Sequence, residues 1–303
     1  MTMLRRVFPL LLGAWMGLPA AAQAQSDPLT RGYPADQCSN CAAWNVPHRP
    51  VHLFGNTYYV GTDGLASILI TSPEGHVLID GALPNSAPLI LANIRALGFD
   101  PRDVKLILNS HAHFDHSGGL AALQRATGAP VAVSAQSAGA VRSGRAGEND
   151  PQYGELFPTP PVPNVTTIQE GRPMRVGSLA LTAYITAGHT PGGTTWTWRS
   201  CEGGRCVDFV YADSQSPISA DGFRFSGNTR YPNAAADFER GYAVLERLSC
   251  DILITPHPSG SSLWQRVATA PDGLIDRDAC RQYAARSRAQ LQARLESERT
   301  RQN

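Results

Sequence analysis

The hydrophobic pattern changes its period at about residue 80. From Val51 onward, short runs rich in β-branched and aromatic residues, VHLF, TYYVG, ASILIT and HVLID, are separated by the turn signals GTDG and SPEG. Such runs predict a meander of antiparallel strands. Residues 86–98 and 117–128 then carry apolar residues at helical spacing, and each segment stops at a glycine. They alternate with the short apolar runs VKLILN and PVAVS, so the order β-α-β-α-β is predicted here.

The second half repeats this theme. The runs LALTAYITA, TTWTWRS, VDFVYA and DILIT predict strands, and residues 234–248 predict a helix before the last of them. A basic amphipathic helix is expected after Asp276, docked on the surface. Two rounds of strands followed by helices predict an α/β fold in which two sheets lie face to face with helices outside.

Residues 144–164 are rich in glycine and proline and have no periodicity. Long connections without regular structure are usually functional or disordered in compact domains. We expect this segment to form a lid or rim between the two halves.

The first 24 residues have the order of a secretory signal. Arg5 and Arg6 precede an apolar run, and the segment ends in Ala22-Gln23-Ala24. The apolar run is too short for a membrane span, which needs about 20 residues. We therefore expect residues 1–24 to be cleaved and the protein to be exported. Residues 25–303 are expected to form a single domain, with an N-terminal extension to about residue 48.

Charge narrows the range of partners. Without Arg5 and Arg6, 24 basic residues face 25 acidic ones. A nearly neutral surface argues against nucleic acid or an anionic membrane as the main partner. A small-molecule substrate and a monomeric protein are expected.

Six cysteines follow the proposed signal, and an exported chain meets an oxidising compartment. Cys201 with Cys206 is a favoured pair, because CEGGRC has a Gly-Gly centre between two strand-like runs. Cys250 with Cys280 would tie the segment before a strand to the start of the last helix. The pattern Cys38-x-x-Cys41 is compatible with a loop disulfide, a redox pair or half a zinc site, of which zinc is the least favoured because no second CxxC exists.

The segment NSHAHFDHSGGL contains several candidate metal-binding side chains. The chain has eight histidines, and three of them lie with an aspartate within residues 111–116. His111 and His113 follow a buried strand and project to the same side of an extended segment. Asp115 and His116 come where the chain must turn, ahead of a helix that Ser117-Gly118-Gly119 would start. Nitrogen and oxygen donors without a nearby thiolate suit zinc in a reactive site.

Two further histidines occupy equivalent places. His189 follows the strand run LALTAYITA in a glycine-rich loop, and His257 follows DILIT between two prolines. Five histidines and one aspartate divide into two groups of three ligands, which leaves coordination room for water, as catalytic zinc sites do.

The segments HAHFDH, AGHTPGG, YADS and TPHP resemble the metallo-β-lactamase superfamily over nearly all of the chain from about residue 45. The combination of an exported chain with WTWRSCEGGRC, YADSQS and LSCDILITPHP resembles subclass B3. This resemblance implies a four-layer αββα sandwich with two mixed sheets and a site along one edge. It also implies hydrolysis of the β-lactam amide of penicillins, cephalosporins and carbapenems by a metal-bound hydroxide, and hence antibiotic resistance.

The resemblance implies a role for individual residues as well. Two zinc ions per chain would be held, the first by His111, His113 and His189 and the second by Asp115, His116 and His257. Asp115 would also act in catalysis by orienting the nucleophile. Ser214 and Ser216 would bind the carboxylate of the substrate. Asp80 and Asp213 would support the metal ligands.

Other functions remain open at this point. A lactonase or thioester hydrolase on the same fold is the main alternative, and a zinc-binding scaffold without activity is another. A serine β-lactamase is disfavoured, because Lys105, the only lysine, lacks a Ser-x-x-Lys context.

Overall fold

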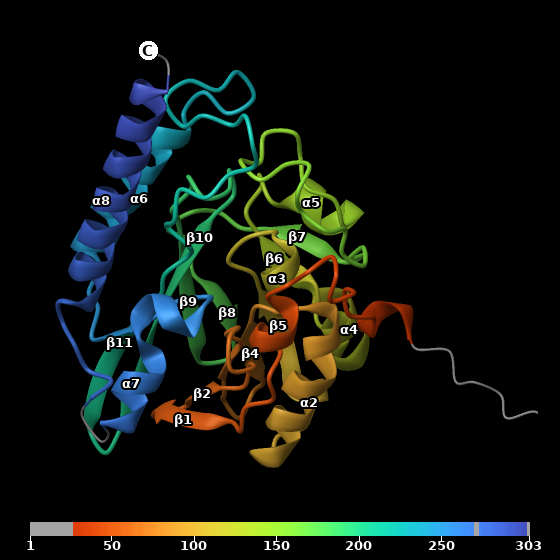
Figure 1. Ribbon diagram of the computed structural model, residues 1–303. Helices are drawn as coiled ribbons and strands as arrows, with labels where there is room; N and C mark the ends of the chain where they lie inside the picture. Colours follow the sequence, from red (N-terminus) through yellow and green to blue (C-terminus); the bar gives the residue numbers. More distant parts are fainter. Residues whose placement is uncertain (1–26, 270–272, 302–303) are drawn as a thin grey trace, which may run out of the picture.

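The computed structural model describes residues 27–269 and 273–301 (Figure 1). The expected signal at residues 1–24 lies outside this range. No helix within the described part is both long enough and apolar enough to span a bilayer.

Seven strands form the first sheet in the order of the sequence. Its first four strands pair antiparallel, as the meander predicted, and the last three add in parallel. The sheet is therefore mixed. Its strands are β1 (Val51–Phe54), β2 (Thr57–Tyr59), β3 (Ile68–Ile70), β4 (His76–Ile79), β5 (Val104–Leu108), β6 (Val131–Val133) and β7 (Val165–Thr167).

Five strands form the second sheet, in the order β12-β11-β10-β9-β8. All neighbours pair antiparallel except β11 and β12, which are parallel, so this sheet is mixed too. The short strands β7 and β8 were not predicted from the sequence. The members are β8 (Met174–Val176), β9 (Leu179–Ile185), β10 (Thr194–Glu202), β11 (Arg205–Tyr211) and β12 (Ile252–Ile254).

Helices cover the outer face of each sheet (Figure 1). One apolar cluster lies between the first sheet and α2 and α4, and another lies between the second sheet and α6 and α8. The third lies between the sheets. The helices are α1 (Cys41–Trp44), α2 (Ala87–Ala96), α3 (Phe114–Ser117), α4 (Leu120–Thr127), α5 (Ala138–Ser143), α6 (Ala234–Arg247), α7 (Leu263–Ala268) and α8 (Ala279–Thr300), with 3₁₀ turns η1 (Pro28–Thr30), η2 (Pro84–Ser86), η3 (Pro101–Asp103) and η4 (Pro258–Ser261).

Alternation along the strands explains the sandwich. In β11, Phe209 and Tyr211 point into the cluster between the sheets, whereas Val210 points toward α6 and α8. Strand side chains alternate between faces, so a strand that is apolar at every position is covered on both sides. The four-layer αββα sandwich implied by the resemblance is confirmed.

Three cysteine pairs have their Sγ atoms at bonding distance. Cys201 and Cys206 face each other across β10 and β11, and Cys250 and Cys280 join the residue before β12 to α8, as the sequence indicated. The third pair is the loop pair Cys38 and Cys41. Oxidation of these pairs in the exported protein stays a prediction.

Candidate metal centre

The motif residues lie where β5 ends between the two sheets. Ser110 follows the strand, and the chain is extended at His113, which caps the short helix α3. Asp115 and His116 lie within this helix. Both residues precede α4, the helix that was expected after the turn, since α4 begins at Leu120. The one-turn helix α3 itself was not predicted.

Two loops bring the remaining histidines to the same edge. His189 follows β9, and Gly188 before it has φ +136°, with the Phe238 ring 2.4 Å from where a Cβ would stand. Only glycine fits there, because that backbone conformation and that close approach both exclude a side chain. His257 follows β12 and caps η4.

The six predicted ligands form two groups. His111, His113 and His189 make up the first group, and their candidate donor atoms all lie within 4.8 Å of one another; the same holds for Asp115, His116 and His257 in the second. The groups adjoin, since the ring centroids of His111 and His116 are 4.4 Å apart. Apart from the partly exposed His257, these side chains are buried.

Hydrogen bonds orient the rings of the first group. His111 Nδ1 lies 2.7 Å from Asp213 Oδ1, and His189 Nδ1 lies 2.9 Å from the carbonyl oxygen of Ser216. His113 uses the opposite nitrogen, because its Nε2 lies 3.1 Å from both carboxylate oxygens of Asp150. Acceptors of this kind fix the tautomer of a metal-binding imidazole.

The donor set fits zinc. With Nδ1 committed to Asp213, the Nε2 of His111 is buried and has no hydrogen-bond partner. A buried polar atom without a partner is costly, and a cation removes this cost. In the second group, Oδ2 of Asp115 lies 3.3 Å from His116 Nε2 and 3.2 Å from His257 Nε2, so three donors converge.

Electrostatics puts these groups in the ligating protonation state. Burial, followed by repulsion from the neighbouring imidazoles, holds the pKa of His111 well below its usual value. The same causes lower the pKa of His189 to about 3. Burial would raise the pKa of Asp115, but the imidazoles of His116 and His257 hold it well below its ordinary value. Neutral imidazoles and an ionised carboxylate are the forms that bind metal.

The two supporting aspartates differ in what they touch. Asp213 contacts the His111 ring directly. Asp80 was expected to orient a ligating imidazole, but its carboxylate instead accepts hydrogen bonds from Asn109, Ser110 and Tyr211. It holds the backbone and side chain of the residue that precedes His111, and thus acts one step further from the cluster.

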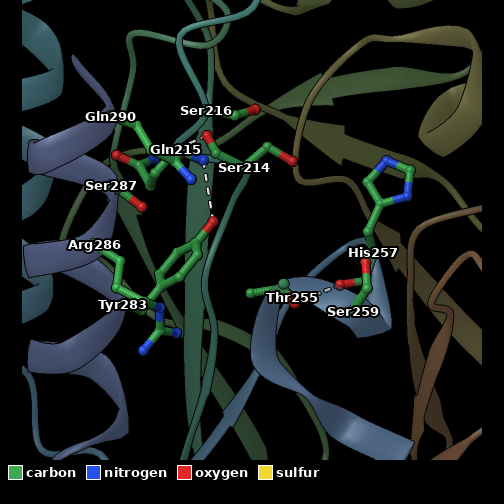
Figure 2. A pocket seen from close by; sticks show the side chains of 11 residues that line it. Ser214, Gln215, Ser216, Thr255, His257, Ser259, Tyr283, Arg286, Ser287 and Gln290 are labelled. Carbon is green, nitrogen blue, oxygen red and sulfur yellow. Dashed lines mark hydrogen bonds between the residues drawn. The ribbon is translucent and has the colours of Figure 1, made fainter. Parts of the chain in front are cut away.

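Ser214 and Ser216 line a cavity of about 270 Å³ with His257 on its opposite side (Figure 2). The Ser214 side chain points toward His257, and Ser216 lies beside it near Gln215. Beyond His257, the ring of Trp44 lies with its centroid 5.1 Å from the imidazole, so the N-terminal extension reaches the centre.

Asp150 was missed by sequence reasoning. It lies in the aperiodic segment 144–164, which indeed forms no strand or helix after α5. An aspartate in a polar loop has no pattern that distinguishes it from surface residues. Only the folded chain shows that it bonds His113.

Strands, layers and donor groups together define a metal-dependent hydrolase built on the αββα sandwich. Residues 60–298 match the family model described as the metallo-beta-lactamase superfamily. The chain belongs to this superfamily, and within it to subclass B3.

Solved structures support the subclass. The subclass B3 enzyme MEM-A1, from a soil metagenome library, is 50% identical with a TM-score of 0.84, over 85% of this chain and 99% of that chain. The Rm3 metallo-β-lactamase is 53% identical with a TM-score of 0.85, over 86% and 99%. SMB-1, solved with 2-mercaptoethanesulfonate, is 43% identical with a TM-score of 0.81, over 84% and 99%.

Curated relatives match a much shorter segment. The N-acyl homoserine lactonase AttM of Azorhizobium caulinodans is 33% identical over 81 residues, which is 20% of this chain and 31% of that lactonase. The AttM of Agrobacterium fabrum matches equally little, at 35% identity. These short matches agree with membership of the superfamily, but they cover only a part of the fold.

Proposed function

We propose that this protein hydrolyses the amide bond of β-lactam antibiotics with two zinc ions per chain, held by the two donor groups. The observation that carries this proposal is the unpaired, buried Nε2 of His111 inside a complete set of six donors. The full-length likeness to subclass B3 enzymes supports the substrate class.

The first ion would bind His111, His113 and His189, and the second Asp115, His116 and His257. When bound, such a pair of zinc ions supplies an acidified water and a Lewis acid for the carbonyl and the leaving nitrogen. No thiolate ligand is needed, because each group already offers three nitrogen or oxygen donors. Ser214, in the loop after β11, lies outside both groups.

Asp115 is the proposed catalytic residue. It meets His116 and His257 through Oδ2, which leaves Oδ1 to orient the attacking water and accept its proton. Its lowered pKa keeps it ionised at neutral pH, which is the form that binds a cation and accepts a hydrogen bond from water.

Ser214 and Ser216 are the proposed contacts for the carboxylate that β-lactams carry beside the ring. Both side chains line the cavity next to His257, so a substrate bound there would present its amide to the donor groups. Hydroxyl groups can donate to a carboxylate without adding charge to the site.

We include in this proposal a cleaved signal at residues 1–24, a periplasmic location, a single domain from residue 25 to 303, and a monomer. A range that extends to carbapenems, and hence a role in resistance, belongs to it as well. The signal pattern and the three cysteine pairs support export.

Turnover of a penicillin, a cephalosporin and a carbapenem, measured beside a homoserine lactone and S-lactoylglutathione, tests the function. We expect the three β-lactams to be hydrolysed at least about tenfold better, as kcat/KM, than the other two. Removal of zinc with dipicolinate should abolish this activity and added zinc should restore it. Full activity after complete metal removal would end the proposal, and a preference for the lactone would favour the alternative.

A further inference from the structure

The loop between β11 and α6 has no regular secondary structure. Residues 212–233 form neither strand nor helix. The shape of such a segment depends on the contacts of its individual groups, because no ladder of backbone hydrogen bonds holds it.

The first part of this loop supports the metal centre. The carbonyl oxygen of Ser216 orients His189, as described above. A few residues later, the amide of Ala220 donates to the carbonyl oxygen of Pro151 at 2.9 Å. Pro151 follows Asp150, which bonds His113. The loop thus touches one ligand of the first group, His189, directly and a second, His113, through Pro151 and Asp150.

The second part of the loop is held by the far end of α8. Glu298 is only 5% exposed. Its Oε1 accepts the backbone N–H of Phe225 at 3.0 Å, and its Oε2 accepts that of Ser226 at 2.9 Å. Arg294, one turn earlier, donates its Nε to the same carboxylate at 2.8 Å.

This is an unfavourable place for a carboxylate. Burial disfavours its charge, and so does the negative end of the helix dipole. Burial alone would raise the pKa of Glu298, yet the hydrogen bonds from Ser226, Phe225 and Arg294 lower it below its usual value. The loop amides therefore keep this carboxylate charged, and the carboxylate in turn fixes the loop.

Arg294 adds a second set of contacts. Its Nη2 donates to Ser219 Oγ at 2.8 Å and to the carbonyl oxygen of Phe223 at 3.0 Å, and its guanidinium lies 5.4 Å from the centre of the Phe225 ring. Both ends of the segment 219–226 are thereby tied to one face of α8.

We propose that Glu298 and Arg294 are positioning residues for the metal centre. They clamp the segment 219–226 to α8. This clamp holds Ser216 against His189, and through the Ala220 amide it holds Pro151, the residue after Asp150. The C-terminal helix thus acts on the first group of ligands through the loop, although none of its residues belongs to that group.

Hydrogen exchange of the zinc-loaded protein tests the clamp away from the altered side chain. In Glu298→Ala, we expect the amides of Ala220 and Asp221 to exchange about tenfold faster or more, because their local opening becomes easier. These two amides bond to Pro151 and Glu155, whereas the Glu298 carboxylate bonds to Phe225, Ser226 and Arg294. Glu298→Gln, which keeps the shape and one acceptor, should show a smaller rise and guards against a variant that fails to fold.

Glu296→Ala is the matched control. Glu296 lies on the same turn of α8 but is exposed and forms an ion pair with Arg299. We expect exchange in the loop to stay as in the wild type. Faster exchange at Phe225 and Ser226 alone, with Ala220 and Asp221 unchanged, would overturn the clamp, because the contact would then be purely local.

Zinc affinity supplies the second readout. In competition with a chelator, Glu298→Ala should bind one of its two zinc ions about tenfold more weakly than the wild type does, as is typical when support of a ligand is lost. Affinity within twofold of wild type, with a loosened loop, would refute the positioning role.

The kinetic part rests on the proposed function: kcat/KM for a β-lactam should fall with the zinc affinity. If the wild type binds zinc but hydrolyses no β-lactam, the proposed function fails, while the exchange and chelator measurements still decide the clamp.

Discussion

Asp80 offers a sharp test of how the start of the metal motif is held. Its side chain is fully buried and accepts four hydrogen bonds. Oδ1 receives Asn109 Nδ2 at 2.8 Å and the Ser110 amide at 2.7 Å, while Oδ2 receives Ser110 Oγ at 2.6 Å and Tyr211 Oη at 2.8 Å. Its φ is +61°, in the left-handed region that aspartate and asparagine tolerate better than alanine.

Replacing Asp80 by alanine leaves four buried donors without their acceptor. At about 1 kcal/mol or slightly more for each, the loss of unfolding free energy is about 4 to 6 kcal/mol. The left-handed backbone adds about 1 kcal/mol for alanine. A loss of this size approaches the whole stability of many domains, so Asp80→Ala should be largely unfolded under mild conditions.

Asparagine should behave very differently. Its oxygen can take the place of Oδ1, where Asn109 and the Ser110 amide can only donate. Its NH₂ then faces two hydroxyls, those of Ser110 and Tyr211, which can rotate to accept. Burial also raises the pKa of Asp80, because it disfavours the charged form, and a neutral amide avoids this cost. We expect Asp80→Asn to lie within about 1 kcal/mol of the wild type.

Urea unfolding in excess EDTA, followed by the fluorescence of the buried Trp196 and Trp198, measures these differences without a contribution from zinc. Tyr211→Phe removes one donor together with its need for a partner and should cost about 1 kcal/mol. The reasoning is refuted if Asp80→Ala is nearly as stable as the wild type, or if asparagine is as damaging as alanine.

Further predictions concern the ligands and the cysteines. His257→Ala should lower bound zinc from two equivalents toward one by metal analysis, and an unchanged content would disprove its role as a ligand. Ser214→Ala should keep both metals but raise KM, whereas loss of a metal would show that the serine is a ligand. Asp150→Asn should weaken zinc binding by about 10- to 100-fold, because His113 loses its charged acceptor; equal affinity would contradict this. Thiol titration of the unfolded, unreduced protein should find no free thiol, and two reactive thiols would disprove one of the pairs.

The ligand residues were predictable because local pattern and strand topology coincide. His111, His189 and His257 each follow a short apolar strand, and loops at one edge of a sandwich meet there. The residues that orient these ligands were not equally visible. Asp150 and Glu298 stand in a loop and on a polar helix face, where acidic residues are ordinary, and nothing in their neighbourhood marks them.

The sequence by itself determined the longer strands and helices of both halves, without the short elements β7 and β8. It also determined the two cysteine pairs at the hairpin and at the last helix and the six candidate donors. Periodicity and ligand chemistry are local properties, and one chain displays them directly. Only the tertiary structure decided which groups orient the donors. Asp213 bonds His111, Asp150 bonds His113, and contacts of α8 hold the loop whose Ser216 carbonyl bonds His189. These partners are far from the ligands in sequence, and only packing of the two halves brings a buried carboxylate to the one nitrogen that needs it.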